Sequence, residues 1–108
     1  YVIQFNREVV EDRFAEVARR LNLKGNNDAE LTDALVEYIY QLNKDLGLAT
    51  TLQDFGVSEE DFNKHLDTMA ENALEDPCTG TNPRETSFEQ MKELFKASYY
   101  GKEALVKA

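Results

Sequence analysis

Apolar residues recur every three or four positions along four stretches of this chain, and no useful length of it alternates apolar and polar residues. The first pattern is typical of helices that bury one face, whereas alternation would mark half-buried strands. At 108 residues, the chain fits one small domain with one modest core. The sequence therefore predicts an all-α fold, a small bundle of about four main helices.

The expected helix ends follow from capping residues. Asn6, Asn27 and Ser58 are candidate N-caps for the first three helices, and Thr86 with Glu89 forms a capping box for the fourth. A glycine, Gly47, lies where the second helix should end. We expect main helices near Glu8–Leu21, Ala29–Leu46, Glu59–Glu75 and Ser87–Tyr100, with one short turn around Leu52 to Phe55.

The helical spacing also selects a core. Its predicted members are large apolar residues that fall on one face of each helix: Phe14, Leu35, Ile39, Leu42, Phe62, Leu66, Met69, Met91 and Phe95. Further apolar side chains at Tyr1 to Phe5, and at Val36 and Tyr40, lie outside these stripes. We expect them to be buried against a partner, with a second copy of the chain as the substitute for missing helices, and hence a homo-oligomer.

Charge and cysteine content exclude several classes of protein. With 12 basic and 21 acidic residues, the net charge of -9 has the wrong sign for binding nucleic acid. The segment from Ser58 to Asp76 contains seven acidic residues and one basic residue, Lys64. We interpret it as a solvated helix face, with an acidic docking patch as the less favoured alternative. A single cysteine, no apolar run near membrane length and no signal-like segment indicate a cytoplasmic protein without membrane contact. Because it starts at Tyr1, we expect the chain to be a piece of something longer.

Few residues have the spacing that catalysis or metal binding requires. His65 is the only histidine, and with Cys78 and scattered acids it forms no recognisable ligand set, so we interpret it as a surface or packing residue. A calcium loop starting at Asp76 fails, because Thr81 and Ser87 occupy the positions that need Gly and Glu. Nucleotide-binding glycine motifs and a nucleophile elbow are also missing from the sequence. We predict no catalytic residue and no metal ligand in this chain.

One segment, DPCTGTNPR at residues 76–84, is a long polar loop between two capped helices. Its two prolines restrict the backbone, and Asn82 is held extended because Pro83 follows it. Loops held this firmly often shape a site. The alternative is a plain connector in which Asn82 and Arg84 only satisfy backbone carbonyls.

The same loop, followed by an amphipathic helix, resembles the C-terminal signature of iron-containing (group III) alcohol dehydrogenases. The opening YVIQFN, the connector GLATTLQDFGVSEEDF and the ending ASYYGKE are also similar to that family. The resemblance covers residues 1–101 as the C-terminal part of the helical domain, which is dehydroquinate synthase-like, and leaves 102–108 as a tail.

The resemblance implies a parent enzyme that interconverts small alcohols with aldehydes or ketones, using NAD(P) and iron or zinc. In the family one Asp and three His hold the metal, and a separate N-terminal domain binds the dinucleotide; none of these parts is present here. It implies that Cys78 lines the wall of the substrate and cofactor cleft, and that Thr79, Asn82 and Arg84 fix the loop. The isolated chain is then inactive and binds no cofactor, while its partners are the dinucleotide-binding domain and the rest of the helical domain. The alternative is a stand-alone acidic helical module that binds another protein.

Overall fold

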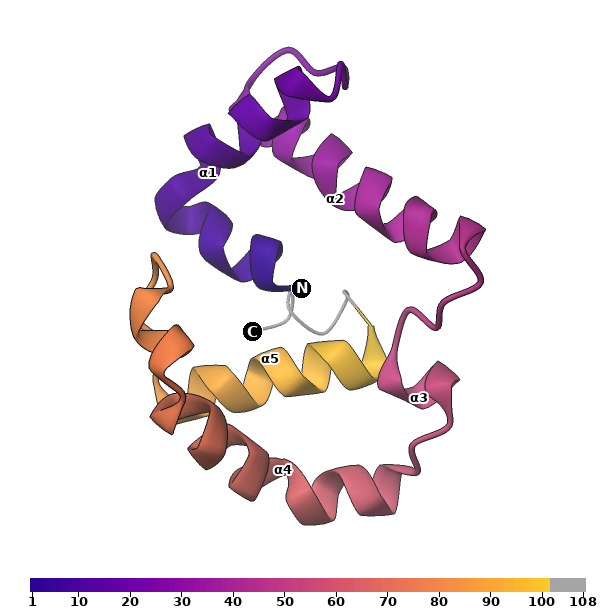
Figure 1. Cartoon of the computed structure of the whole chain (residues 1–108), viewed down its shortest axis with the longest axis vertical. Coiled ribbons are helices and arrows are strands. Elements are labelled where there is room, and N and C mark those ends of the chain that lie inside the picture. Colours follow the sequence, from indigo (N-terminus) through magenta and orange to yellow (C-terminus); the bar gives the residue numbers. More distant parts are fainter. Residues whose placement is uncertain (102–108) are drawn as a thin grey trace. The chain divides into compact units, whose positions relative to one another are not determined.

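The computed structural model describes residues 1–101, and its secondary structure is entirely helical over that range. The elements, in chain order, are α1 (Val2–Arg20), α2 (Asp28–Asp45), α3 (Leu52–Phe55), α4 (Glu59–Glu75), the 3₁₀ helix η1 (Pro77–Thr81) and α5 (Phe88–Tyr100) (Figure 1). This confirms the predicted all-α class, the four main helices and the short turn. The tail predicted at 102–108 lies outside the described residues.

The described chain forms two compact units. The first, Val2–Leu48, consists of α1 packed on α2. Its core cluster combines small residues of α1 with large residues of α2: Ala15 and Ala18 lie against Leu31 and Leu35. Because alanine adds little bulk, the two helices can approach closely at this contact.

An arginine on α1 reinforces the contact through polar bonds. The Arg7 guanidinium donates to the Glu11 carboxylate on its own helix at 2.7 Å, and to Asp33 at 2.6 Å and the Ala29 carbonyl at 3.0 Å on α2. These charge-assisted bonds join one face of α1 to the first two turns of α2.

The predicted start of the first helix is wrong. Asn6 does not cap it: α1 already begins at Val2, and Asn6 lies inside the helix, buried. The helical geometry is interrupted once, at Val10, whose φ of -136° and ψ of 31° are not helical. Ile3, in the first turn of α1, packs against the core of this unit, so the residues before the bend also belong to the packed helix.

The second unit contains the described residues from Ala49 onward, together with Tyr1. Its core is Phe62 and Leu66 of α4 against Tyr99 of α5. The Phe62 and Tyr99 rings stack with their centroids 4.4 Å apart, and the Tyr99 hydroxyl donates to the Val57 carbonyl at 2.9 Å. The last turn of α5 is thus tied both to α4 and to the connector that precedes α4.

The capping predictions for the later helices are partly confirmed. Asn27 and Ser58 cap α2 and α4 as predicted, since their side chains accept from the amides three residues later. The box at Thr86 and Glu89 is wrong by one residue, because Ser87 accepts from the Gln90 amide at 3.1 Å and Gln90 accepts from the Ser87 amide at 3.0 Å. Ser87 and Gln90 have the same spacing and satisfy both backbone groups.

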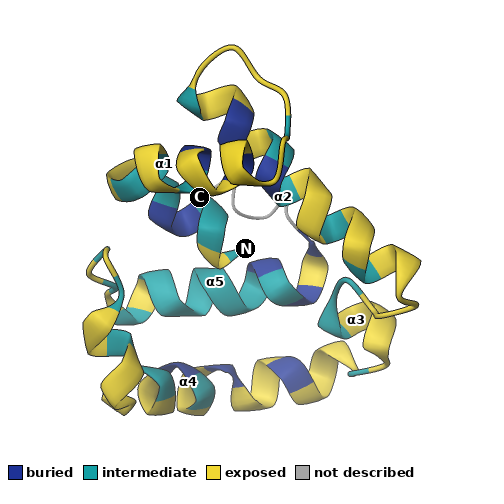
Figure 2. Ribbon diagram, turned by 45° about the horizontal axis from the view of Figure 1, so that its top comes forward, coloured by how far each residue is buried: buried dark blue, intermediate teal, exposed yellow. Residues whose placement is uncertain are grey.

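The predicted core is partly confirmed. Leu35, Phe62 and Leu66 are buried, whereas Phe14, Met69, Met91 and Phe95 are half-buried. Ile39 and Leu42 are 37% and 44% exposed, so their assignment to the core is wrong. The reason is that α1 covers only the first half of the apolar face of α2, and the second half is largely exposed (Figure 2).

Replacing the buried phenylalanine tests the core of the second unit. We expect Phe62→Ala to lower the free energy of unfolding by about 3–5 kcal/mol, because it removes the ring beneath Tyr99 and leaves a cavity. Phe55→Ala is the matched control: Phe55 is 76% exposed, and its removal should change stability by less than about 0.5 kcal/mol. Urea unfolding followed by circular dichroism measures both, and equal losses would contradict the assigned core.

Stability should also depend on alkaline pH. Burial, with the nearby charge of Glu59, raises the pKa of the Tyr99 hydroxyl above its ordinary value of 10.0. Above that pH the unfolded chain loses this proton more readily than the folded chain, so the free energy of unfolding should fall as pH rises. The slope should be shallower in Tyr99→Phe, in urea titrations between pH 9 and 11. An unchanged slope would show that Tyr99 ionises alike in both states.

Candidate functional site

The loop at residues 76–84 is anchored by a pair of antiparallel helices. Phe62, near the start of α4, stacks on Tyr99 at the end of α5, while Asp67 further along α4 binds the Lys92 ammonium of α5 at 3.1 Å. The later residue of α4 pairs with the earlier residue of α5, so the two helices are antiparallel. The end of α4 and the start of α5 therefore lie at the same end of the helix pair (Figure 1). The loop therefore closes one end of a packed pair of helices.

Local hydrogen bonds fix the start of the loop. Asp76 follows α4, and its carboxylate accepts from the Cys78 amide at 2.8 Å, which caps η1. Pro77 occupies the first turn of η1, where its missing N–H costs no helical bond. The Thr79 hydroxyl donates back to the Ala73 carbonyl in the last turn of α4, so η1 is fastened to the helix it leaves.

The second half of the loop is held in the same way. The Thr81 hydroxyl donates to the Cys78 carbonyl at 2.7 Å. Asn82 has the extended backbone predicted for a residue before proline, with φ -65° and ψ 138°. Its side-chain amide donates to the Arg84 carbonyl at 2.7 Å.

The structure thus places all four predicted site residues in one ordered loop. Thr79 and Asn82 make side-chain bonds to backbone carbonyls, and Arg84 contributes its own carbonyl to the Asn82 bond. Cys78 is exposed and has a free thiol. The loop-fixing role of Thr79, Asn82 and Arg84, and the position of Cys78 on a cleft wall, remain predictions.

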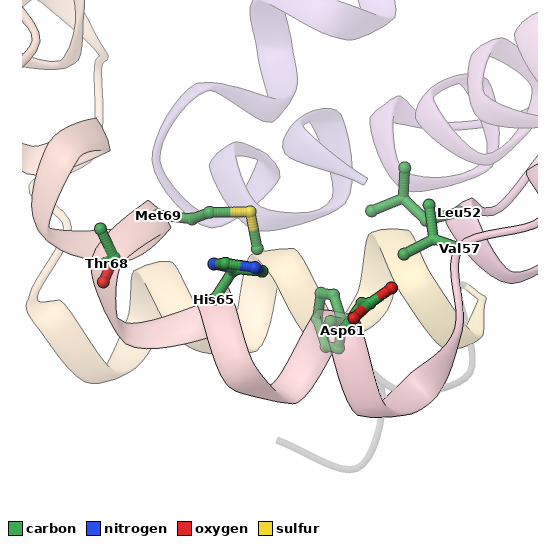
Figure 3. A pocket seen from close by; sticks show the side chains of 7 residues that line it. Leu52, Val57, Asp61, His65, Thr68 and Met69 are labelled. Atoms are coloured by element: carbon green, nitrogen blue, oxygen red, sulfur yellow. The ribbon is translucent and has the colours of Figure 1, made fainter.

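A pocket of about 390 Å³ lies in the second unit, and the sequence analysis missed it. Leu52, Val57, Phe62 and Met69 line it together with Asp61, His65 and Thr68 of α4, and the surface that these side chains present to the pocket is almost entirely apolar (Figure 3). The signal that could have found it is the apolar pair of Val57, just before the N-cap Ser58, and Phe62, because residues at these two positions often pack together and bring the connector onto the first turn of the helix. None of the loop residues at 76–84 lines this pocket.

The side chains of residues 1–101 do not fit a metal centre. Over that range no group of three or more His, Cys, Asp or Glu residues is close enough to hold an ion. His65 is exposed on α4, and Cys78 lies in the loop that follows this helix. Nor is any helix in the described part of the chain long and apolar enough to cross a bilayer.

Comparison with known proteins gives the family. The model of the C-terminal region of the Fe-containing alcohol dehydrogenase family matches residues 1–99. The chain is 40% identical to an NADPH-dependent butanol dehydrogenase of Clostridium saccharobutylicum, over 95% of this chain and 26% of that protein. It is 34% identical to a lactaldehyde reductase of Escherichia coli K12, over 92% of this chain and 25% of that protein.

A longer relative shows the same pattern. A bifunctional aldehyde-alcohol dehydrogenase of Escherichia coli K12 is 32% identical over 93% of this chain and 11% of its own length. The chain thus spans about a quarter or less of these curated relatives. The matches confirm the resemblance drawn from the loop and the flanking segments: this chain belongs to the Fe-containing alcohol dehydrogenase family.

Proposed function

We propose that this chain is the C-terminal helical region of a metal-dependent, NAD(P)-dependent alcohol dehydrogenase that interconverts small alcohols with aldehydes or ketones. The observation that carries the proposal is the family match over residues 1–99. Relatives named for butanol, lactaldehyde and aldehyde-alcohol chemistry support a small substrate. In this proposal the parent is cytoplasmic, and the free thiol of Cys78 in this chain is in keeping with a reducing compartment.

In this proposal the chain contributes shape to the active site, and other parts of the parent hold the metal and the dinucleotide. The described residues lack a ligand cluster, so no chemical step is assigned to a metal here. The ordered loop at residues 76–84 presents Cys78, exposed and unpaired, as part of the cleft wall. Bonds from Thr79 and Asn82 to nearby carbonyls hold that wall in place, which positions substrate and excludes water.

A segment exchange tests the proposal. The matched region of the Clostridium saccharobutylicum butanol dehydrogenase is replaced by this chain, which is 40% identical to it, and butanol oxidation is followed through NADP⁺ reduction. We expect measurable turnover, because the exchanged segment supplies the same helical scaffold and loop. A folded exchange protein without activity would contradict the proposal and favour the alternative, an acidic interaction module.

Variants of the exchange protein test the cleft wall. We expect Cys78→Trp to lower kcat/KM about 10- to 100-fold, since a bulky side chain on the wall displaces the substrate. Glu85→Trp adds the same bulk at an exposed position just beyond the loop and should stay within about twofold. Equal effects of the two substitutions on kcat/KM would show that Cys78 does not line the cleft wall.

The unfused chain is the remaining control. Purified alone, it should show no stoichiometric iron or zinc, no saturable NAD(H) binding and no alcohol-dependent NADH production. About one tightly bound ion per chain, or turnover that survives Cys78→Ser, would instead indicate a self-contained enzyme.

A further inference from the structure

The apolar face of α2 continues past the part that α1 covers. Leu31 and Leu35, on the first half of this face, are 4% and 3% exposed, because they belong to the core that α2 forms with α1. Over residues 1–101 the second half stays exposed (Figure 2). Its large apolar side chains form what we call the α2 stripe: Tyr38 at 43% exposed, Ile39 at 37%, Leu42 at 44% and Leu46 at 65%.

The stripe continues the core without a polar break. From Leu31 to Leu46 the face carries an aliphatic or aromatic residue at every step of three or four positions. A face that is buried in its first half and unchanged in residue type in its second half has the pattern of one core that extends further. The stripe is therefore continuous with the interface that α2 already makes with α1.

The charged groups next to the stripe are held away from it. After Tyr38, the charged residues of α2 are Lys44 and Asp45. The Lys44 ammonium lies over the Tyr40 ring, 5.3 Å from its centroid, and the Asp45 carboxylate accepts from the Gln41 side-chain amide at 2.8 Å. Neither Tyr40 nor Gln41 belongs to the stripe, so the stripe itself can lose its water without burying a charge.

Two observations decide what covers the stripe. The matched region is only 26% of the butanol dehydrogenase relative, so in such a protein most of the polypeptide lies outside this chain. A segment of the same polypeptide is tethered, which gives it a high effective concentration at the stripe. A second copy of this chain would instead bring its own net charge of -9 toward an equal charge, which opposes association.

We propose that the α2 stripe is buried in the parent protein by an apolar segment of the same polypeptide that lies outside this chain. This inference rests on the proposed function, in which the chain is one region of a longer enzyme. The covering segment presents aliphatic or aromatic side chains, because a charge placed against the stripe would lose its water and gain no partner. The core that begins at Leu31 and Leu35 then extends along the whole of α2.

Cysteine labelling tests this burial. Leu42→Cys is introduced into the chain alone and into the butanol dehydrogenase exchange protein, and mass spectrometry of peptides follows its reaction with iodoacetamide. We expect labelling at position 42 to be at least about tenfold slower in the folded exchange protein than in the chain alone, because a covered side chain reacts only after local opening. Lys44→Cys, exposed on another side of α2, is the matched control and should react at similar rates in both proteins.

A charge at the same position tests what the burial contributes to stability. Leu42→Glu should lower the urea midpoint of the exchange protein and leave that of the chain alone nearly unchanged, because only the exchange protein covers this position. Gln41→Glu adds the same charge one residue away, outside the stripe, and should shift the midpoint of the exchange protein much less. Circular dichroism checks that each variant keeps its helices.

The outcomes separate this inference from the proposed function. Equal labelling of position 42 in the two proteins would overturn the inference, and so would protection that rises with protein concentration, which would indicate a second copy. An exchange protein that is inactive but protected at position 42 would contradict the proposed function and support the inference. One that oxidises butanol but reacts freely at position 42 would contradict the inference alone.

Discussion

The Phe62–Tyr99 stack, with the Tyr99 hydroxyl bound to the Val57 carbonyl, is the contact on which the candidate site depends. It fastens the last turn of α5 to the first turn of α4 and to the connector before it. Because the two helices are antiparallel, this contact lies at the end of the pair away from the loop at residues 76–84, and the Asp67–Lys92 pair joins the helices nearer to that loop. We therefore expect loss of the stack to loosen the helix pair that carries the loop.

The loop was readable from sequence because its bonds are local. Asp76 binds an amide two residues ahead, and Thr79 reaches a carbonyl six residues back. Short polar side chains and prolines at such spacing carry their own conformational preferences. The same reasoning placed the caps of α2 and α4. It failed at Asn6, which lies inside α1, and at α5, where two overlapping residue pairs have equal spacing and Ser87 with Gln90 forms the box.

Features that depend on distant contacts were not readable in this way. The bond from Tyr99 to Val57 joins residues 42 positions apart, and the pocket beside it has lining residues from α3, α4 and the connector. Periodicity predicted that one face of α2 is apolar, but the pattern is identical for Leu35, which is buried, and Leu42, which is exposed. Which neighbour covers a face is a tertiary property, here set by the bend of α1 at Val10.

Family membership rests on the matched segment, whereas the proposed roles of the different parts of the parent rest on the resemblance to that family. Residues 1–101 provide helices and a fastened loop, and no cluster of metal-binding side chains lies among them. Backbone ¹⁵N relaxation of the isolated chain tests most directly whether the loop is a preformed wall. Order parameters of about 0.85 for Cys78, Thr79 and Asn82, equal to those of α4 and α5, are the predicted result. Values below about 0.6 in the loop beside rigid helices would contradict it.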